Sequence, residues 1–189
     1  MSSVFENEQY EGINYTTTEI YGSEYDNCTF VNCNFESTDL SSIVFGECKF
    51  TNCNLSNAKL KNTGLKDVDF EACKLLGLNF GACNPFLLEM KFADCDISFA
   101  SFYKLKLKNT KFNSCKLRET DFVDADLTNS LFDNCDLLGV IFENTILEKA
   151  NLSTSVNFII DPEKNKLKKA KFSQQTLSGL LAKYNIEVV

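Results

Sequence analysis

The sequence contains no histidine, and it lacks the motifs by which many enzymes bind nucleotides or activate a nucleophile. Histidine is the side chain whose ordinary pKa allows proton transfer near neutral pH. A P-loop, a dinucleotide-binding glycine motif and a GxSxG motif are also missing from the sequence. These absences argue against an enzyme, and we expect no catalytic residue, no cofactor and no metal site.

Long apolar runs are missing as well. No stretch reaches the length of about 18 apolar residues that a membrane-spanning helix needs. The first twelve residues, MSSVFENEQYEG, are acidic and contain no apolar core of the kind found in signal peptides. We therefore expect a cytoplasmic protein that does not contact a membrane.

What the sequence does contain is an apolar residue at every fifth position. One series runs from Tyr15 to Phe80, and a second runs from Leu87 to Leu152. A period of five fits neither a helix, with 3.6 residues per turn, nor a strand, with a period of two. The pattern therefore predicts a coiled chain that turns a corner after each group of five residues.

A small, uncharged residue lies two positions before most of these apolar residues, and the nine cysteines occupy this position. Both residues of each group should therefore point into a narrow interior. The number of cysteines is odd, and spacings such as that of Cys28 and Cys33 do not resemble a zinc site. We expect free, buried thiols that pack as small apolar side chains.

These features resemble the pentapeptide-repeat family, as in the stretch CTFVN-CNFES-TDLSS from Cys28 to Ser42. The resemblance covers residues 13–155 and implies an all-β solenoid, a right-handed quadrilateral β-helix with four pentads per coil. At twenty residues per coil the repeats amount to about seven coils. A two-residue insertion near Pro85 and Phe86 keeps like residues aligned, including one column of phenylalanines: Phe30, Phe50, Phe70, Phe92, Phe112 and Phe132.

Three segments follow from this pattern. Residues 1–12 are weakly patterned and are expected to cap the first coil, residues 13–157 form the β-helix, and residues 158–189 form a helical C-terminal segment. Asp161 before Pro162, and later Ser173, fit the start of helices. Phe172 and Leu177 are spaced as a hydrophobic staple. Asn185 is expected to end the second helix, before a short final strand.

The C-terminal segment has two interpretations. It can cap the last coil, or it can also join two copies end to end, as in the quinolone-resistance (Qnr-like) and mycobacterial gyrase-inhibitor relatives. We favour capping together with formation of a homodimer, because this segment has more apolar side chains than one coil end would cover. The residues expected at the dimer contact are Leu177, Leu180, Leu181, Tyr184, Ile186 and Val188.

Charge changes sign along the chain. Residues 1–85 carry 12 acids and 5 bases (net −7), residues 86–152 carry 11 and 8 (net −3), and residues 153–189 carry 3 and 6 (net +3). An acidic rod does not suit direct binding of nucleic acid, which requires a basic surface. The lysines between Lys164 and Lys171 are expected to form a solvated helix face.

An acidic rod instead suits a DNA mimic, which is the mechanism that the resemblance to the Qnr-like members implies. Such a protein binds a type II topoisomerase, DNA gyrase or topoisomerase IV, and protects or inhibits it. This chain lacks the long projecting loops of many Qnr-like members, and in this feature it resembles compact relatives such as the microcin-immunity member. We expect the partner to contact an acidic wall made of Glu119, Asp121, Asp124, Asp126, Asp133 and Asp136. The alternative is that these charges form only a solvated face, which is the more common role of charge runs.

An apolar patch supports the alternative, a structural or regulatory scaffold for another protein. Tyr103 and Val123 are twenty residues apart and should stack on one face, with Phe99 at the adjoining corner and Phe86 at the insertion. Exposed aromatic side chains often anchor protein interfaces, and single exposed apolar residues are also common. The sequence therefore predicts a protein-binding rod and leaves its partner open.

Overall fold

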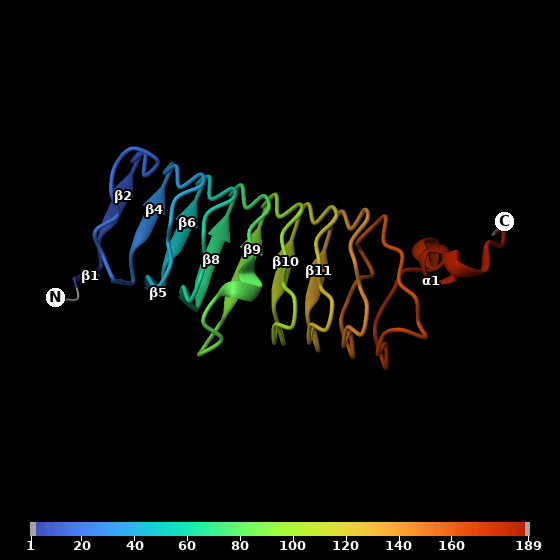
Figure 1. The fold of residues 1–189 in the computed structure, drawn as a ribbon. Coiled ribbons are helices and arrows are strands. Elements are labelled where there is room, and N and C mark those ends of the chain that lie inside the picture. The colour runs from blue at the N-terminus through green and yellow to red at the C-terminus, as the bar shows by residue number, and fades with distance from the viewer. Residues whose placement is uncertain (1–2, 188–189) are drawn as a thin grey trace.

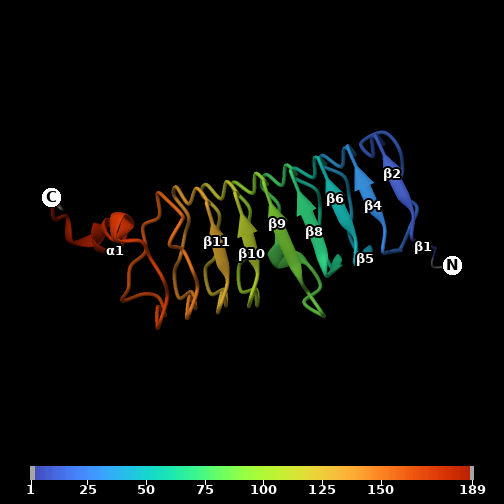
Figure 2. The ribbon, with the colours of Figure 1, turned by 180° about the vertical axis from the view of Figure 1, so that it is seen from behind.

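The computed structural model describes residues 3–187, which form one β-solenoid (Figure 1). Each strand pairs in parallel with the strand one coil further on, usually twenty residues away, as for Phe30 and Phe50. The strands make two sheets, one of four strands in the order β1-β3-β5-β7 and one of seven in the order β11-β10-β9-β8-β6-β4-β2. The predicted fold class is confirmed, and Figure 2 shows the rod from behind.

The strands are short because the chain turns a corner after each one. Those of the four-stranded sheet are β1 (Val4–Glu6), β3 (Glu24–Asp26), β5 (Val44–Gly46) and β7 (Gly64–Lys66). Those of the seven-stranded sheet are β2 (Gln9–Glu11), β4 (Thr29–Val31), β6 (Lys49–Thr51), β8 (Val68–Glu71), β9 (Met90–Ala93), β10 (Lys111–Asn113) and β11 (Leu131–Asp133).

Seven strands in one sheet are separated by six intervals, so this sheet spans about six turns, one fewer than the predicted count. Isolated bridges continue the pairing toward the C-terminus, from Leu131 to Asn151 and on to Lys171. At the other end, β1 and β2 lie within residues 1–12, the segment expected to be a cap. Each pairs in register with the next coil.

The corners explain how a five-residue repeat closes into a coil. Two residues after most of the large inward side chains, the backbone adopts a left-handed conformation, as at Asn27 (φ 49°) after Tyr25 and at Asn32 (φ 54°) after Phe30. Among residues other than glycine, asparagine and aspartate adopt this conformation most readily. Many corners therefore carry Asn or Asp, and the chain turns by about a quarter of a coil at each.

The interior is filled by stacked rings. Phe92 and Phe112 stack with ring centres 5.1 Å apart and planes 1° from parallel, and Phe112 and Phe132 stack at 4.8 Å. Phe102, from another side of the coil, meets Phe112 edge to face at 6.0 Å. Both arrangements are favoured by aromatic rings. Like side chains therefore stack on like along the rod, including across the insertion.

The small inward residues do more than fill space. Their hydroxyls and thiols donate hydrogen bonds to carbonyl oxygens of the preceding coil, such as Thr63 to Leu40 at 2.8 Å and Ser130 to Leu107 at 2.8 Å. The Cys53 thiol donates to the Phe30 carbonyl at 3.4 Å. All nine cysteines are free and buried. Thr, Ser and Cys therefore join neighbouring coils as well as packing between them.

The insertion forms a loop, Pro85–Leu88, which projects from the middle of the rod on its lower edge in Figure 1. Asn84 pairs with Gly64 before the loop, twenty residues apart, and Phe92 pairs with Phe70 after it, 22 apart. The prediction that Leu87 starts the second inward series is wrong, because Leu87 is exposed and Leu88 packs against the core instead.

The predicted helix at Asp161 is also wrong. Residues 162–164 form a turn in which the Asp161 carboxylate accepts a hydrogen bond from the Glu163 amide. Asn165 then lies buried and donates to the Phe142 carbonyl of the previous coil at 3.0 Å. This inward amide continues the coil and leaves no room for a helix.

The second predicted helix is present but short. It consists of the 3₁₀ turn η2 (Gln174–Thr176), α1 (Ser178–Leu181) and the 3₁₀ turn η3 (Ala182–Tyr184), and a left-handed Asn185 ends it as predicted. Ser173 does not cap the helix with its side chain. Phe80–Ala82 forms a further 3₁₀ turn, η1. Among residues 3–187, no helix has the length and apolar character that crossing a bilayer requires.

Buried thiols and phenols make the stability of the rod sensitive to alkaline pH. Burial raises the pKa of Cys48, Cys83 and Tyr10 to about 12, from ordinary values of 9.0 for the thiols and 10.0 for the phenol. The unfolded chain therefore loses these protons first as the pH rises. The contribution of these groups to the free energy of unfolding is fully present below about pH 9 and is lost progressively from there toward about pH 12.

We expect the urea midpoint of unfolding to stay level between about pH 7 and pH 8.5 and to fall above about pH 9. In the same samples, a thiol reagent should label none of the nine cysteines of the folded protein and all nine after unfolding. Labelling of a native thiol at neutral pH, or a midpoint unchanged at about pH 10.5, would contradict the buried arrangement.

Candidate protein-binding surfaces

The outer surface has four sides, because each coil turns four corners. Side 1 carries the sheet β1-β3-β5-β7, and side 2 carries the seven-stranded sheet. Sides 3 and 4 are held by isolated bridges. The bridge ladder of side 3 includes Lys74, Asp96, Lys116 and Asp136; that of side 4 includes Asn79, Ser101, Asp121 and Ile141; and side 1 continues past β7 through Lys106, Asp126, Ile146 and Lys166.

The predicted acidic wall does not form a single surface. Asp121 lies in the ladder of side 4, Asp126 in that of side 1 and Asp136 in that of side 3, while Asp133 lies in β11 on side 2. The physical reason is the length of the coil. Residues 119–136 make up almost one full coil, so the acidic side chains among them point outward on all four sides of the rod.

Several of these acids are also engaged within the chain. Lys108 approaches Asp126 at 3.3 Å, and Arg118 approaches Asp136 at 2.6 Å. Partial burial pushes the pKa of both carboxyls up, but hydrogen bonds and these cations outweigh burial. Both pKa values therefore lie below the ordinary value. These two carboxylates stay charged and have intramolecular partners.

Side 4 brings part of the acidic wall together with part of the apolar patch. The Ser101 hydroxyl donates to Asp121 at 3.0 Å, and the Lys104 amide donates to the Val123 carbonyl at 3.0 Å. The segment 99–104 therefore lies beside the segment 119–124 of the next coil. We call the resulting group of side chains the mixed surface: Phe99, Tyr103, Glu119, Asp121, Val123 and Asp124.

The mixed surface offers both aromatic and charged groups to a partner. Phe99 is 59% exposed and Tyr103 is 42% exposed. Glu119 and Asp124 are exposed and have no ion pair within the described chain, while the Lys104 ammonium lies 4.7 Å from the centre of the Tyr103 ring. The patch was predicted from residues twenty apart. Its junction with the acids follows from the same spacing.

Phe86, the fourth residue of the predicted patch, lies elsewhere. It is in the loop Pro85–Leu88, which projects from side 1 beside Lys104 and Lys106. Phe86 and Leu87 are each 65% exposed. The Asn84 side chain accepts a hydrogen bond from the Phe86 amide at 3.0 Å, which holds the start of the loop.

The C-terminal segment closes the end of the rod. Leu180 packs against the core, and the Ile160 amide donates to the Gly179 carbonyl at 3.0 Å. Lys183 pairs with Asp161 at 2.8 Å and with Glu163 at 2.7 Å, and these carboxylates raise the pKa of Lys183. The segment therefore docks on the last coil.

The other side chains expected at a dimer contact remain at the surface. Leu177, Leu181, Tyr184 and Ile186 are exposed, and Val188 lies outside the described residues. Ile186 is not in a strand. An end-to-end dimer through these residues stays a prediction.

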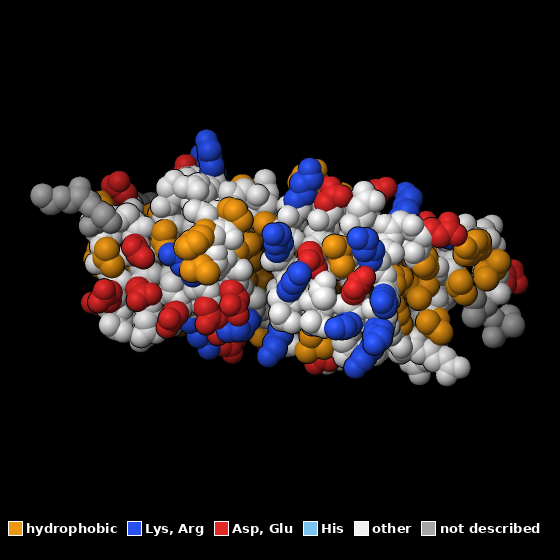
Figure 3. Space-filling view, turned by 90° about the horizontal axis from the view of Figure 1, so that it is seen from below, with side chains coloured by type: hydrophobic (Ala, Val, Ile, Leu, Met, Phe, Trp, Pro, Cys, Tyr) orange, Lys and Arg blue, Asp and Glu red, His pale blue; other side chains and the backbone are white. Residues whose placement is uncertain are grey.

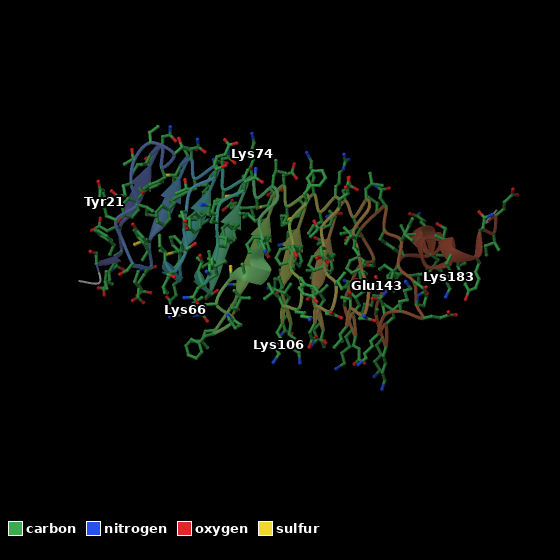
Figure 4. All side chains as sticks on the ribbon, in the orientation of Figure 1. Tyr21, Lys66, Lys74, Lys106, Glu143 and Lys183 are labelled. Carbon is green, nitrogen blue, oxygen red and sulfur yellow. The ribbon has the colours of Figure 1, made fainter. Side chains whose placement is uncertain are left out.

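Side 1 has a charge pattern that sequence reasoning missed. Acidic side chains gather over its N-terminal half and lysines over its C-terminal half (Figure 3). Side 1 is the lower edge of the rod in Figure 4, where Lys66 and Lys106 project from it and Lys74 projects from the opposite edge. The charge pattern of side 1 can be found in the sequence by comparing residues twenty apart. A count of charges along the sequence hides the pattern, because it adds together all four sides.

A model of the family described as "Pentapeptide repeat region" matches residues 23–85 and 86–181. The chain belongs to the pentapeptide-repeat family. No curated protein matches the sequence. The family assignment explains the period of five and the four-sided coil, and it leaves the partner of this pentapeptide-repeat protein undefined.

Two solved structures illustrate the shared fold. A trypsin-treated variant of QnrB1, a plasmid-mediated fluoroquinolone resistance protein, is 18% identical with a TM-score of 0.65 over 100% of both chains. HetL, a pentapeptide repeat protein involved in heterocyst differentiation regulation from the cyanobacterium Nostoc sp. strain PCC 7120, is 14% identical with a TM-score of 0.73. That match covers 89% of this chain and 85% of HetL.

Docking of the C-terminal segment depends on Gly179. A Cβ atom at this position would lie 2.3 Å from the Phe158 carbonyl oxygen, so a side chain cannot be accommodated without a shift of the backbone. We expect Gly179→Ala to release the segment and to speed hydrogen exchange of the Ile160 amide at least tenfold, a loss of about 1.4 kcal/mol of local stability. The neighbouring Ser178→Ala is the control. Equal exchange rates in both variants would contradict the docking.

Proposed function

We propose that this pentapeptide-repeat protein is a non-enzymatic rod that binds another protein through the mixed surface. The observation that carries the proposal is the position of Phe99 and Tyr103, two exposed aromatic side chains, beside the exposed carboxylates of Glu119 and Asp124. Aromatic groups supply affinity at the centre of interfaces, and charges supply orientation and association rate. The partner surface should be basic with an apolar recess.

The open mixed surface and the filled interior of residues 3–187 support binding over catalysis. Stacked side chains fill the interior, and the outer sides present strands and corners. In the described part of the chain, the hollows on side 1 are lined mainly by charged side chains, with the loop residues beside them. Catalysis by paired carboxylates generally needs a site that excludes water, and the mixed surface is open to solvent.

The first partner to test is a type II topoisomerase, DNA gyrase or topoisomerase IV. A basic groove that binds DNA would attract the carboxylates of Glu119, Asp121 and Asp124, so the rod would compete with DNA there. The likeness to QnrB1, a fluoroquinolone resistance protein, motivates this choice of partner. In this form, DNA mimicry rests on three acids of side 4 and not on the whole predicted acidic wall.

A regulatory scaffold for a different protein is the second candidate. Phe99 and Tyr103 favour it, because aromatic anchors bind a partner without any need for a DNA-binding groove. The likeness to HetL, which is involved in regulation of differentiation, offers a precedent for the fold in regulation. The two candidates differ in how strongly they depend on the acids.

A gyrase supercoiling assay with increasing amounts of the protein, with and without a fluoroquinolone, tests the proposal. We expect inhibition or rescue at micromolar protein. Glu119→Lys with Asp124→Lys should weaken the effect on the order of tenfold or more, because two attractive charges become repulsive. Replacing Glu11 and Asp94 with lysine gives the same change in net charge away from the mixed surface and should have little effect.

The aromatic residues test the mixed surface itself, whichever partner binds there. Phe99→Ser with Tyr103→Ser should weaken binding of any partner at this surface, whereas Tyr21→Ser removes an exposed aromatic from the N-terminal end of the rod as a control. If neither gyrase nor topoisomerase IV responds to the protein, the topoisomerase proposal is refuted. A partner whose binding ignores both pairs of substitutions would refute the mixed surface itself.

A further inference from the structure

Side 1 carries opposite charges on its two halves. The exposed or half-buried acids of the N-terminal half are Glu6, Glu24, Asp26, Glu47, Asp67 and Glu89, with Lys66 the one base among them. The lysines of the C-terminal half are Lys106, Lys108, Lys149, Lys166, Lys168 and Lys169, with Asp126 and Glu148 the acids among them. Figure 3 looks directly at this side, with acids on the left and lysines on the right.

The loop Pro85–Leu88 lies between these halves. It places Phe86 and Leu87, each 65% exposed, above the middle of the side. Leu87 is held with φ 56°, an unfavourable conformation for a branched side chain. An apolar centre flanked by opposite charges is the arrangement of a protein interface that is complementary to itself.

We propose that two copies of this chain pair through side 1 in antiparallel orientation, related by a twofold axis perpendicular to the rods. Such an axis reverses the order of coils, so the acidic half of one copy faces the lysine half of the other. The same contact then forms twice, as in any isologous dimer. The inference is independent of the mixed surface, which lies on side 4.

The ladders of side 1 fix the register. An axis midway between the loop and the coil of Leu107 pairs four coils with four, those of Tyr25, Phe45, Leu65 and the loop with those of Leu167, Leu147, Leu127 and Leu107, and leaves the first coil, that of Phe5, outside the contact. Asp26 of one copy then faces Lys168 of the other. The contact is about 38 Å long, at about 4.8 Å per coil.

Further pairs follow from the same axis. Glu24 faces Lys166, Glu47 faces Lys149, and the apolar Val44 faces Ile146. The acids within the lysine half do not clash, because Asp126 faces Gly64 and Glu148 faces Gly46. Along these ladders no like charges oppose one another, and the two loops meet near the axis.

The charges that would cross the interface are available for it. In residues 3–187, Asp26, Glu47, Lys149 and Lys168 form no ion pair within the chain, whereas Asp126 is already paired with Lys108. A polyanion such as DNA would suit the lysine half but would be repelled by the acidic half. A second copy satisfies both halves.

Sedimentation velocity over a range of concentrations tests the proposal through a charge exchange. Asp26→Lys with Glu47→Lys, the acid variant, and Lys149→Glu with Lys168→Glu, the lysine variant, should each weaken dimerisation on the order of 100-fold. An equimolar mixture of the two variants should regain a dimer close in affinity to the original, because each altered half then faces an opposite charge. Raising NaCl from about 0.05 M to about 0.5 M should weaken the original dimer.

Three further variants locate the contact: one tests the loop, and two are controls on other surfaces. Lys74→Glu with Lys116→Glu makes the same charge change as the lysine variant on side 3 and should leave the dimer intact. Phe86→Ser should weaken it. Leu177→Ser with Leu181→Ser should leave the dimer intact, because pairing through side 1 does not use the C-terminal segment. Loss of the dimer in this variant would favour the alternative, the end-to-end dimer predicted from the sequence, and overturn the proposal.

Failure of the mixed variants to pair, or a monomer at all concentrations up to about 100 μM, would also overturn it. So would a duplex DNA that binds the original protein and not the lysine variant while the protein itself stays monomeric. The supercoiling assay substitutes no residue of side 1, so a failure of dimerisation and a failure of the proposed function are separate results.

Discussion

The fold depends on one constraint: each coil must match the coil before it, twenty residues earlier. Backbone hydrogen bonds run between coils, and the inward rings stack on rings of the same kind, as Phe92 does on Phe112. A coil on its own buries little, because its neighbours supply the other half of every contact. The outer surface is therefore organised by the same columns, so residues twenty apart in the sequence are neighbours on the surface.

This constraint explains which predictions succeeded. The period of five repeats many times, so it predicts the coil, the inward residues and the buried cysteines from local composition alone. The insertion was located because the phenylalanine column shifts by two residues. The assignment of Leu87 failed for a related reason. The residues of the loop Pro85–Leu88 have no partners twenty residues away, so the repeat does not specify which of them points inward, and Leu88 packs against the core in place of Leu87.

The errors at the C-terminus and on the surface come from judging residues by their sequence neighbours. Asp161 and Pro162 look like the start of a helix, but the buried amide of Asn165 bonds across the coil and continues it. The acidic residues 119–136 look like one cluster, but they surround the rod. Conversely, the net charge counted along the sequence changes from −7 to +3 but mixes all four sides, and only columns of twenty residues assign the charge separation to side 1.

Removal of one complete coil tests this account most directly. A deletion of residues 111–130 joins Thr110 to Leu131, so a small inward residue still precedes the next strand, and every column stays in phase. The account predicts a cooperatively folding protein with the same circular dichroism per residue and a shorter rod by small-angle X-ray scattering. A deletion of residues 111–120, half a coil, should fail to fold in this way. If both deletions behave alike, the matching of coils is not what specifies this structure.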